Sequence, residues 1–442
     1  MDRISDLPDC ILLHILSFLP TKTAFLTTVL SRRWTHLCHH LQHLHFDQNQ
    51  FRNHNTWSDS SAKKRFLAIV NWILSRHNAP PIRTFRLTCD LNPSDESTLE
   101  WFIIKVLGPN LEELNLQLSS ILCSVSRVAI PNGIFSCTSL VTLRLNGVHV
   151  RIPSPSAPSC RYHLPSLKTL ELYNVEISVG ILEEILSHCT ALETLILGYV
   201  RQSSVKVQLS ICFPSLKSLH FKSYFGETLR LLVIDTPSLK RLDIQVELWF
   251  HEIRVRNLHN VEDARINISK QSFVLEFLVE LCRIRILELG LSVFDCLPEV
   301  PPHRIPEFTC LHTLELTVMW CLDTRYIMNM LQKCPMLKLL AIVFSISLPI
   351  MDPHPSRKWD HSVKVPTCLA SHLKVLKSRD MLNPEMIEIF SPMFFNMDLF
   401  WSHLIFRWII RDLKDFQKNY PFCQGAPRRA KLTFAGYPTN YG

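Results

Sequence analysis

The sequence predicts an α/β protein in which a short N-terminal group of helices precedes a solenoid of short parallel strands and helices. Two observations predict this arrangement. Within the first 47 residues, apolar side chains recur at helical spacing and are interrupted at proline and serine residues. Further along, an L-x-x-L-x-L template returns at an interval of about 25 residues, which is the period of a stacked repeat.

Three helices are predicted in the N-terminal region. In the first, Ile11, Ile15 and Phe18 lie at i, i+4 and i+7, so they form one apolar stripe. Leu12 and Leu16 form a second stripe on a neighbouring face. Proline is tolerated in the first helical turn and ends a helix elsewhere, while Ser or Thr can cap a helix start. The residues that set the boundaries are Pro8, Pro20, Thr21 or Thr23, and Ser31.

A segment of this size buries too little surface to form a generous core, yet it is apolar on more than one helix face. Some of these side chains must therefore be covered by other material, either by the rest of the chain or by a partner protein. The periodicity alone leaves both alternatives open.

The stretch LPDCILLHILSFLPTKTAFLTTVLSRRW, residues 7–34, resembles the F-box of plant F-box proteins nearly from end to end. The shared elements are Leu7-Pro8-Asp9, Ile15-Leu16-Ser17, Leu19-Pro20-Thr21-Lys22 and Leu30-Ser31-Arg32-Arg33-Trp34. The resemblance implies docking on a Skp-type adaptor, and through it on the cullin and RING subunits of a ubiquitin ligase. By resemblance, the adaptor contact uses Leu7, Pro8, Ile11, Ile15, Leu16, Leu19, Pro20, Val29, Leu30 and Trp34. The F-box is expected over residues 1–47.

Residues 36–47, HLCHHLQHLHFD, place histidines at i, i+4 on a possible helix. This spacing suits a metal site, but nearby carboxylate or thiolate partners are few, so we expect solvated histidines and no metal. Residues 48–81 then form a polar linker and an amphipathic helix, with apolar side chains at helical spacing from residue 66 to residue 74.

The repeat occupies residues 82–350. Strong copies of the template begin at Leu111, Leu140, Leu167, Leu192, Leu216, Leu239, Ile284, Leu311 and Leu337. Weaker copies begin at Ile82 and Val261. The period lies inside the range of leucine-rich repeats, in which each copy supplies one strand to a shared core and no copy is stable alone. The asparagine common in such repeats is absent from its usual place, so the array is expected to be irregular.

Helices are expected between the strands, on the convex side, over residues 99–107, 181–186 and 327–334. Cysteine precedes the first leucine of a copy by three residues at Cys137, Cys189 and Cys334. A thiol that recurs at one repeat position is best interpreted as a small core residue, which argues against redox or metal chemistry for these three cysteines.

The residue between the second and third template positions faces away from the core, onto the concave sheet. In the nine strong copies this column holds one arginine, three glutamates and one aspartate, a net charge of −3. A face meant for phosphates should be basic, so this column argues against nucleic acid and favours a protein target. The candidate target contacts are Arg144, Glu171, Tyr173, His220, Lys222, Asp243 and Glu315.

After the repeats, WDHSVKVPTCLASHLKVLKS (residues 359–378) resembles the start of the FBD region that follows the repeats in many plant F-box proteins. The FBD-like segment is assigned to residues 351–390. The resemblance then fails, and residues 391–442 form a divergent tail. We hypothesise that residues 391–426 fold poorly or reflect an aberrant gene model, and that residues 428–434 resume the last strand of the family.

Composition narrows the classes of function. A net charge of +8 in 442 residues is modest, and the 15 cysteines include no CxxC pair, so they are interpreted as free thiols of an intracellular protein. No segment predicts a signal peptide or a membrane span. Phosphate-binding, metalloprotease and hydrolase motifs are all missing, so neither an enzyme nor a cofactor is expected.

The preferred function is a substrate-recognition adaptor of an SCF-type (Skp–cullin–F-box) ubiquitin ligase, acting in the nucleus or cytoplasm. The F-box would dock on the adaptor while the repeats hold a protein target, so that the chain supplies proximity rather than chemistry. Two alternatives remain. One is a repeat scaffold that never joins a ligase, and the other is a small-molecule co-receptor of the same domain order, as in the plant auxin and jasmonate receptors.

Overall fold

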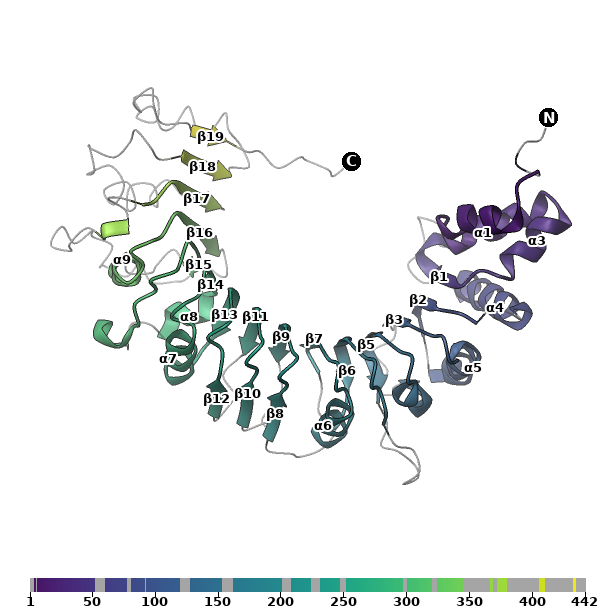
Figure 1. The fold of residues 1–442 in the computed structure, drawn as a ribbon, viewed down its shortest axis with the longest axis horizontal. Coiled ribbons are helices and arrows are strands. Elements are labelled where there is room, and N and C mark those ends of the chain that lie inside the picture. The colour runs from purple at the N-terminus through teal and green to yellow at the C-terminus, as the bar shows by residue number, and fades with distance from the viewer. Residues whose placement is uncertain are drawn as a thin grey trace. The chain divides into compact units, whose positions relative to one another are not determined.

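The computed structural model describes residues 4, 6–51, 60–77, 81–91, 93–119, 128–152, 162–200, 208–223, 231–246, 252–296, 300–319, 324–345, 366–368, 372–379, 405–409 and 432–434. The chain divides into two compact units. The N-terminal unit comprises residues 1–216 and 220–232, and the C-terminal unit comprises residues 217–219 and 233–442. Each unit is built on a parallel sheet (Figure 1).

The N-terminal unit begins with the predicted group of helices. They are α1 (Asp9–Ser17), α2 (Thr21–Leu26), the short 3-10 helix η1 (Thr27–Val29) and α3 (Arg32–Cys38). Pro8 and Pro20 each stand directly before a helix with extended backbone, so proline marks both helix starts. Helices α1 and α2 pack on α3, and Leu12, Leu16 and Trp34 are buried among them.

The prediction of a helix over residues 36–47 is wrong. Helix α3 ends at Cys38, and His43–Asp47 is a strand, β1, that pairs in parallel with the next strand of the sheet. Leu44 and Phe46 are buried and alternate with exposed histidines, so the two-residue period of the apolar side chains overrode the i, i+4 spacing of the histidines. The sheet therefore starts one strand earlier than the repeat template indicates.

Six strands of the N-terminal unit lie side by side in chain order. They are β1, β2 (Thr84–Asp90), β3 (Glu113–Ser119), β5 (Thr142–Arg151), β6 (Thr169–Glu176) and β7 (Thr194–Gly198). The helices α4 (Ser60–Arg76), α5 (Glu96–Val106) and α6 (Val179–Ser187) lie along one side of this sheet (Figure 1). Short elements complete the unit: η2 (Gln48–Phe51), η3 (Pro93–Asp95), β4 (Val128–Ala129), η4 (Asn132–Ser136) and β8 (Gln208–Cys212).

The registers confirm the repeat. Leu114 lies beside Leu143, which lies beside Leu170, which lies beside Leu195, so that equivalent template leucines form rows across the sheet. All four are fully buried. Burial of one leucine side chain stabilises a fold by about 1.5–3 kcal/mol, and each row needs its neighbours to exclude water.

The C-terminal unit repeats the pattern. Its strands are β11 (Arg241–Val246), β12 (Glu252–Arg256), β13 (Asp263–Ile268), β14 (Ile286–Leu289), β15 (Thr313–Met319), β16 (Leu339–Ser345), β17 (Val375–Arg379), β18 (Ile405–Ile409) and β19 (Leu432–Phe434). Its helices are α7 (Gln271–Glu280), α8 (Leu291–Cys296), η6 (Pro302–Arg304) and α9 (Thr324–Gln332). The strands β9 (Ser218–Ser223) and β10 (Leu231–Asp235) each contribute residues to both units.

The end of the chain continues the sheet. Strand β17, from the FBD-like segment, pairs in parallel with β16, and β18 and β19 follow in order. Strand β18 falls inside residues 391–426, so the prediction that this range folds poorly does not hold for residues 405–409. Strand β19 lies where we expected the last strand to resume. The remainder of residues 391–426 lies outside the described residues.

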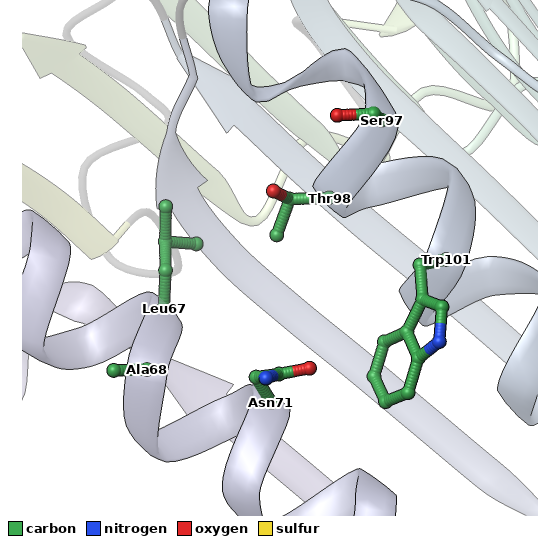
Figure 2. Close-up of a pocket in the computed structure, with 6 residues that line it drawn as sticks. All are labelled: Leu67, Ala68, Asn71, Ser97, Thr98 and Trp101. Atoms are coloured by element: carbon green, nitrogen blue, oxygen red, sulfur yellow. The ribbon is translucent and has the colours of Figure 1, made fainter.

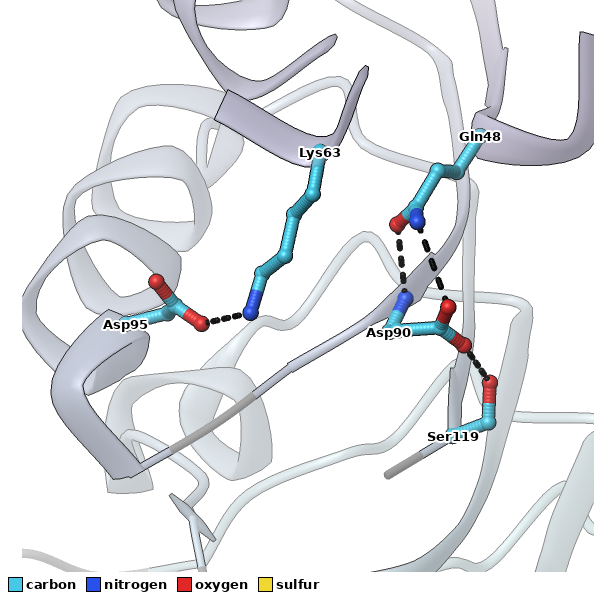
Figure 3. A network of polar contacts seen from close by, with 5 residues as sticks. All are labelled: Gln48, Lys63, Asp90, Asp95 and Ser119. Atoms are coloured by element: carbon cyan, nitrogen blue, oxygen red, sulfur yellow. Dashed lines mark hydrogen bonds and ion pairs between the residues drawn. The ribbon is translucent and has the colours of Figure 1, made fainter. Parts of the chain in front are cut away.

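A polar network joins the segment after the helical group to the first repeats (Figure 3). Gln48 on η2 reaches the end of β2, where its Oε1 accepts a hydrogen bond from the Asp90 N–H at 2.8 Å and its Nε2 donates to the Asp90 carboxylate at 3.2 Å. Ser119 on β3 donates to the same carboxylate at 2.5 Å. Lys63 on α4 pairs with Asp95. These contacts hold η2 to the sheet and α4 to η3.

Candidate functional site

The N-terminal helices leave one face of α1 uncovered. Ile11, Ile15 and Phe18 are 44%, 40% and 73% exposed, and their spacing places them on the same helix face. The opposite stripe, Leu12 and Leu16, is buried against α3. Of the two apolar faces seen in the sequence, one therefore forms the core and the other is open to a partner.

A second exposed apolar group lies at η1 and its flanks. Val29 is 83% exposed, Leu30 65% and Leu26 59%. Large apolar side chains exposed to this extent and close in sequence usually mark a contact surface. Phe18 and Leu26 belong to these exposed groups although the motif resemblance did not include them.

The residues predicted for the adaptor contact fall into three classes. Exposed are Pro8, Ile11, Ile15, Pro20, Val29 and Leu30, while Leu7 and Leu19 are half-buried. Leu16 and Trp34 are 1% and 8% exposed, so both belong to the core of the helical group. For Leu16 and Trp34 this burial favours support of the exposed residues over direct contact, and the adaptor contact itself stays a prediction.

Arg33 is a positioning residue that spacing did not single out. Its guanidinium donates two hydrogen bonds to the Asp9 carboxylate, at 2.8 and 2.6 Å, and one to the Leu7 carbonyl oxygen at 2.5 Å. It thereby holds the Leu7–Pro8 segment against α3. The opposite charges of Asp9 and Arg33 were visible in the sequence, but their proximity depends on how α1 packs on α3.

On the sheet face of the N-terminal unit, charged side chains pair across neighbouring strands. Arg86 donates to both oxygens of Glu113, at 2.9 and 3.0 Å, and Arg144 lies 3.3 Å from Glu171. Tyr173, His220 and Lys222 are half-buried on strands β6 and β9 of the same unit. The five target-contact candidates of this unit therefore lie on sheet strands, as the template predicts.

The remaining two candidates, Asp243 and Glu315, lie in the C-terminal unit. Asp243 is buried, whereas Glu315 is half-buried. They share their column with Arg265, which pairs with Glu288 at 2.7 Å. The net charge of −3 predicted for the column left out the arginines of the two weak copies, Arg86 and Arg265, so the column is less acidic than expected.

Glu288 has an unusual environment. Burial raises the pKa of the Glu288 carboxyl, and the charges of Glu315 and Asp243 raise it further, while the hydrogen bond from Arg265 opposes these effects. One arginine thus faces three acids on this part of the sheet.

Two of the three recurrent cysteines are core residues. Cys189 and Cys334 are buried, and burial raises the pKa of the Cys189 thiol to about 12 and that of Cys334 further still. A thiol with a raised pKa is a poor nucleophile and a poor metal ligand at neutral pH. Cys137 is half-buried.

A cavity of about 380 Å³ lies between α4 and α5 (Figure 2). Its lining consists of Leu67, Ala68, Asn71, Ser97, Thr98 and Trp101. All six side chains are uncharged, so the lining does not indicate a charged ligand.

Within the described parts of the chain, no three His, Cys, Asp or Glu side chains are grouped as metal ligands would be. The helices described there are too short or too polar to cross a membrane.

Comparison with known protein families gives two matches. Residues 4–45 match the F-box domain, and residues 100–264 match the repeats of the FBD-associated F-box protein At5g56370. The first match ends inside β1, and the second covers β3 to β12 together with most of α5 and the start of β13.

Several curated proteins of Arabidopsis thaliana are similar to this chain. The F-box/FBD/LRR-repeat protein At5g56420 is 30% identical over 390 residues, which are 85% of this chain and 84% of the relative. The FBD-associated F-box protein At4g10400 is 31% identical over 271 residues, and the alignment covers 61% of this chain and 62% of the relative. The putative F-box/LRR-repeat protein At4g15060 is 34% identical over 244 residues, covering 54% of each chain.

Proposed function

Since this chain belongs to the plant family of F-box proteins with leucine-rich repeats and an FBD region, we propose that it recruits a protein target to an SCF-type ubiquitin ligase. The F-box docks on a Skp-type adaptor, which links it to cullin and RING subunits. The repeats bind the target. The activity belongs in the nucleus or cytoplasm.

One observation carries this proposal: the F-box has a buried stripe and an exposed stripe on the same helix. Leu12 and Leu16 are buried in the core, whereas Ile11 and Ile15 keep 44% and 40% of their surface exposed and available to a partner. With the exposed side chains at Val29 and Leu30, they supply apolar area for a contact of about 800 Å² per partner, the usual size of a specific interface.

The chain itself supplies position and leaves the chemistry to other subunits. A target bound on the repeats is brought near the ligase, and proximity raises its effective concentration. The network of Gln48, Asp90 and Ser119 supports this role because it ties the chain after the F-box to the first strands of the sheet.

The test is capture of a recombinant plant Skp-type adaptor by the full-length chain. In the double variant Val29→Asp and Leu30→Asp, charges replace two exposed side chains, so folding should be unchanged. Capture should fall by about tenfold or more, as expected when apolar contacts at an interface are lost. Leu7→Ala with Pro8→Ala should weaken capture as well.

Val279→Asp is the matched control, because Val279 is also an apolar side chain with 55% exposure but lies on α7 of the C-terminal unit. It should leave capture at the wild-type level. Equal capture by the wild-type chain and the Val29/Leu30 variant would refute docking through this surface and leave the scaffold function as the better explanation.

A further inference from the structure

Two tyrosine rings meet on the sheet face of the N-terminal unit. Tyr173 lies on β6 and Tyr199 directly follows β7. Their ring centroids are 5.1 Å apart and their planes are inclined by 83°, an edge-to-face arrangement. Both side chains are half-buried, so part of each remains exposed to solvent.

A glycine makes this arrangement possible. Gly198 is the register partner of Tyr173 on the next strand. A Cβ at Gly198 would come within 2.1 Å of the Tyr173 ring, which shows that the ring lies across the glycine. Ile196, two residues earlier on β7, faces the same side of the sheet and adds apolar surface next to the ring.

Tyr199 adopts a backbone conformation that tyrosine rarely takes. Its φ is 51°, in the left-handed region. The residue at the equivalent place after Tyr173 is Asn174, with φ 55°, and asparagine tolerates this region well. A tyrosine there costs free energy on the order of 1 kcal/mol or more, and such strain is concentrated at functional sites.

A lysine lies on β9, the strand next to β7 in the sheet. The Tyr199 N–H donates to the Lys222 backbone carbonyl oxygen at 2.7 Å, and Lys222 alternates on β9 with the buried Phe221, so its side chain lies on the face of the sheet away from the core. Among the described side chains on this face of β5 to β7, Glu171 is the one acid, and Arg144 lies 3.3 Å from it. On these three strands, a negatively charged ligand therefore meets no acid that lacks a basic neighbour.

We propose that Tyr173, Ile196, Tyr199 and Lys222, together the tyrosine site, bind an extended acidic segment of the target polypeptide. An apolar or aromatic side chain of that segment packs on the two rings, and an adjacent carboxylate lies beside Lys222. Tyrosine combines a large apolar surface with a hydrogen-bonding hydroxyl and few rotatable bonds, which suits it to anchor such a contact. The ligand identity rests on the proposed function, because the bound segment is the target.

The experiment measures retention of synthetic peptides on the immobilised full-length chain. The probes are pools of acetylated octapeptides in which one position is fixed as Phe and the next as Glu, Gln or Lys. The Phe–Glu pool should be retained about tenfold more strongly than the Phe–Lys pool, the effect of one favourable charge contact beside an anchor.

Tyr199→Asn is the decisive variant, because asparagine already occupies the equivalent position at Asn174. It should keep or raise the unfolding midpoint while lowering retention of the Phe–Glu pool about tenfold. Lys222→Gln should remove the preference for Glu over Lys, whereas Lys240→Gln, a lysine change in the C-terminal unit, should leave that preference intact. Equal retention of the Phe–Glu pool by the wild-type chain and Tyr199→Asn, or a preference for the Phe–Lys pool, would overturn the proposal.

Peptide retention does not require the adaptor, so the two proposals fail separately. Loss of adaptor capture with peptide selection intact would refute the ligase role and leave the tyrosine site standing. If adaptor capture is intact and Tyr199→Asn retains the peptides as the wild-type chain does, the tyrosine site alone is refuted.

Discussion

The two units share one local arrangement, a side chain that lies over a glycine, but its other contacts differ between them. In each, a strand side chain lies over a glycine: Tyr173 over Gly198 at the end of β7 in the N-terminal unit, and Asn267 over Gly290 directly after β14 in the C-terminal unit. The Asn267 oxygen accepts a hydrogen bond from the Ser292 N–H at 2.9 Å, so that residue stabilises the start of α8. The Tyr173 ring instead meets a second tyrosine. One copy in each unit thus has a glycine directly after its third template position, and the residue that lies over this glycine makes different contacts in the two units.

The charges differ too. In the N-terminal unit, arginines 86 and 144 are each matched by one glutamate on the next strand. In the C-terminal unit, Arg265 interacts with three acids. A shared repeat template therefore carries two sheet faces of different charge, which is the basis for expecting different ligands.

The largest expected effect tests what the units have in common. Leu170→Ala and Leu287→Ala each remove a fully buried template leucine, one per unit. Each should lower the free energy of unfolding of its unit by about 2–5 kcal/mol, measured by urea denaturation. A loss below about 1 kcal/mol in either unit would mean that its leucine row is not close-packed.

A smaller effect is expected at the glycines. Gly198→Ala and Gly290→Ala place a methyl group within 2.1 Å of the Tyr173 ring and within 2.5 Å of the Asn267 side chain. Each should destabilise its unit by about 1–3 kcal/mol, and only Gly198→Ala should lower retention of the Phe–Glu pool. Tyr173→Ala combined with Gly198→Ala should recover stability but not peptide retention, since the anchor ring is then missing.

Replacing one arginine in each unit should show a second difference between the two sheet faces, in the stability cost of the change. Arg144→Gln leaves one acid without its partner and should lower the free energy of unfolding by less than about 1 kcal/mol in urea denaturation, because the pair is partly exposed to solvent and involves one acid only. Arg265→Gln leaves Asp243, Glu288 and Glu315 facing one another without a cation. It should lower the free energy of unfolding by more than Arg144→Gln does. Equal costs would mean that the acids of the C-terminal unit do not interact.

The smallest effect is a pH dependence within the C-terminal unit. Burial raises the pKa of Glu288 above 4.5, so the folded state holds this proton more tightly and stability is gained as the pH falls toward 4.5. The hydrogen bond from Lys240 lowers the pKa of Glu262, so its contribution is lost as the pH falls below 4.5. The stability of each variant is measured by thermal unfolding from pH 7 to pH 3. Glu288→Gln should remove the gain in stability that occurs as the pH falls toward 4.5. Glu262→Gln should remove the loss of stability that occurs below pH 4.5.

Much of the fold was predictable because its signals are local or periodic. The leucine rows, α5, α6 and α9, and the three F-box helices all follow from spacing that survives without tertiary information. Strand β1 was missed because the histidines at residues 36–43 imitate a helix, and the alternation of Leu44 and Phe46 spans only five residues. Tyr199 was missed because its significance depends on a backbone angle and on the ring beside it.

By itself, the sequence determined that this chain is an F-box joined to leucine-rich repeats, since period and motif are properties of one-dimensional order. Only the tertiary structure decided which motif residues are surface and which are core. Leu16 and Ile15 are neighbours in the motif, yet one is buried and the other exposed, because a helix turns by about 100° per residue and α3 covers one side only. The same holds for Tyr173, whose ring reaches Tyr199 only because the parallel register sets it over a glycine.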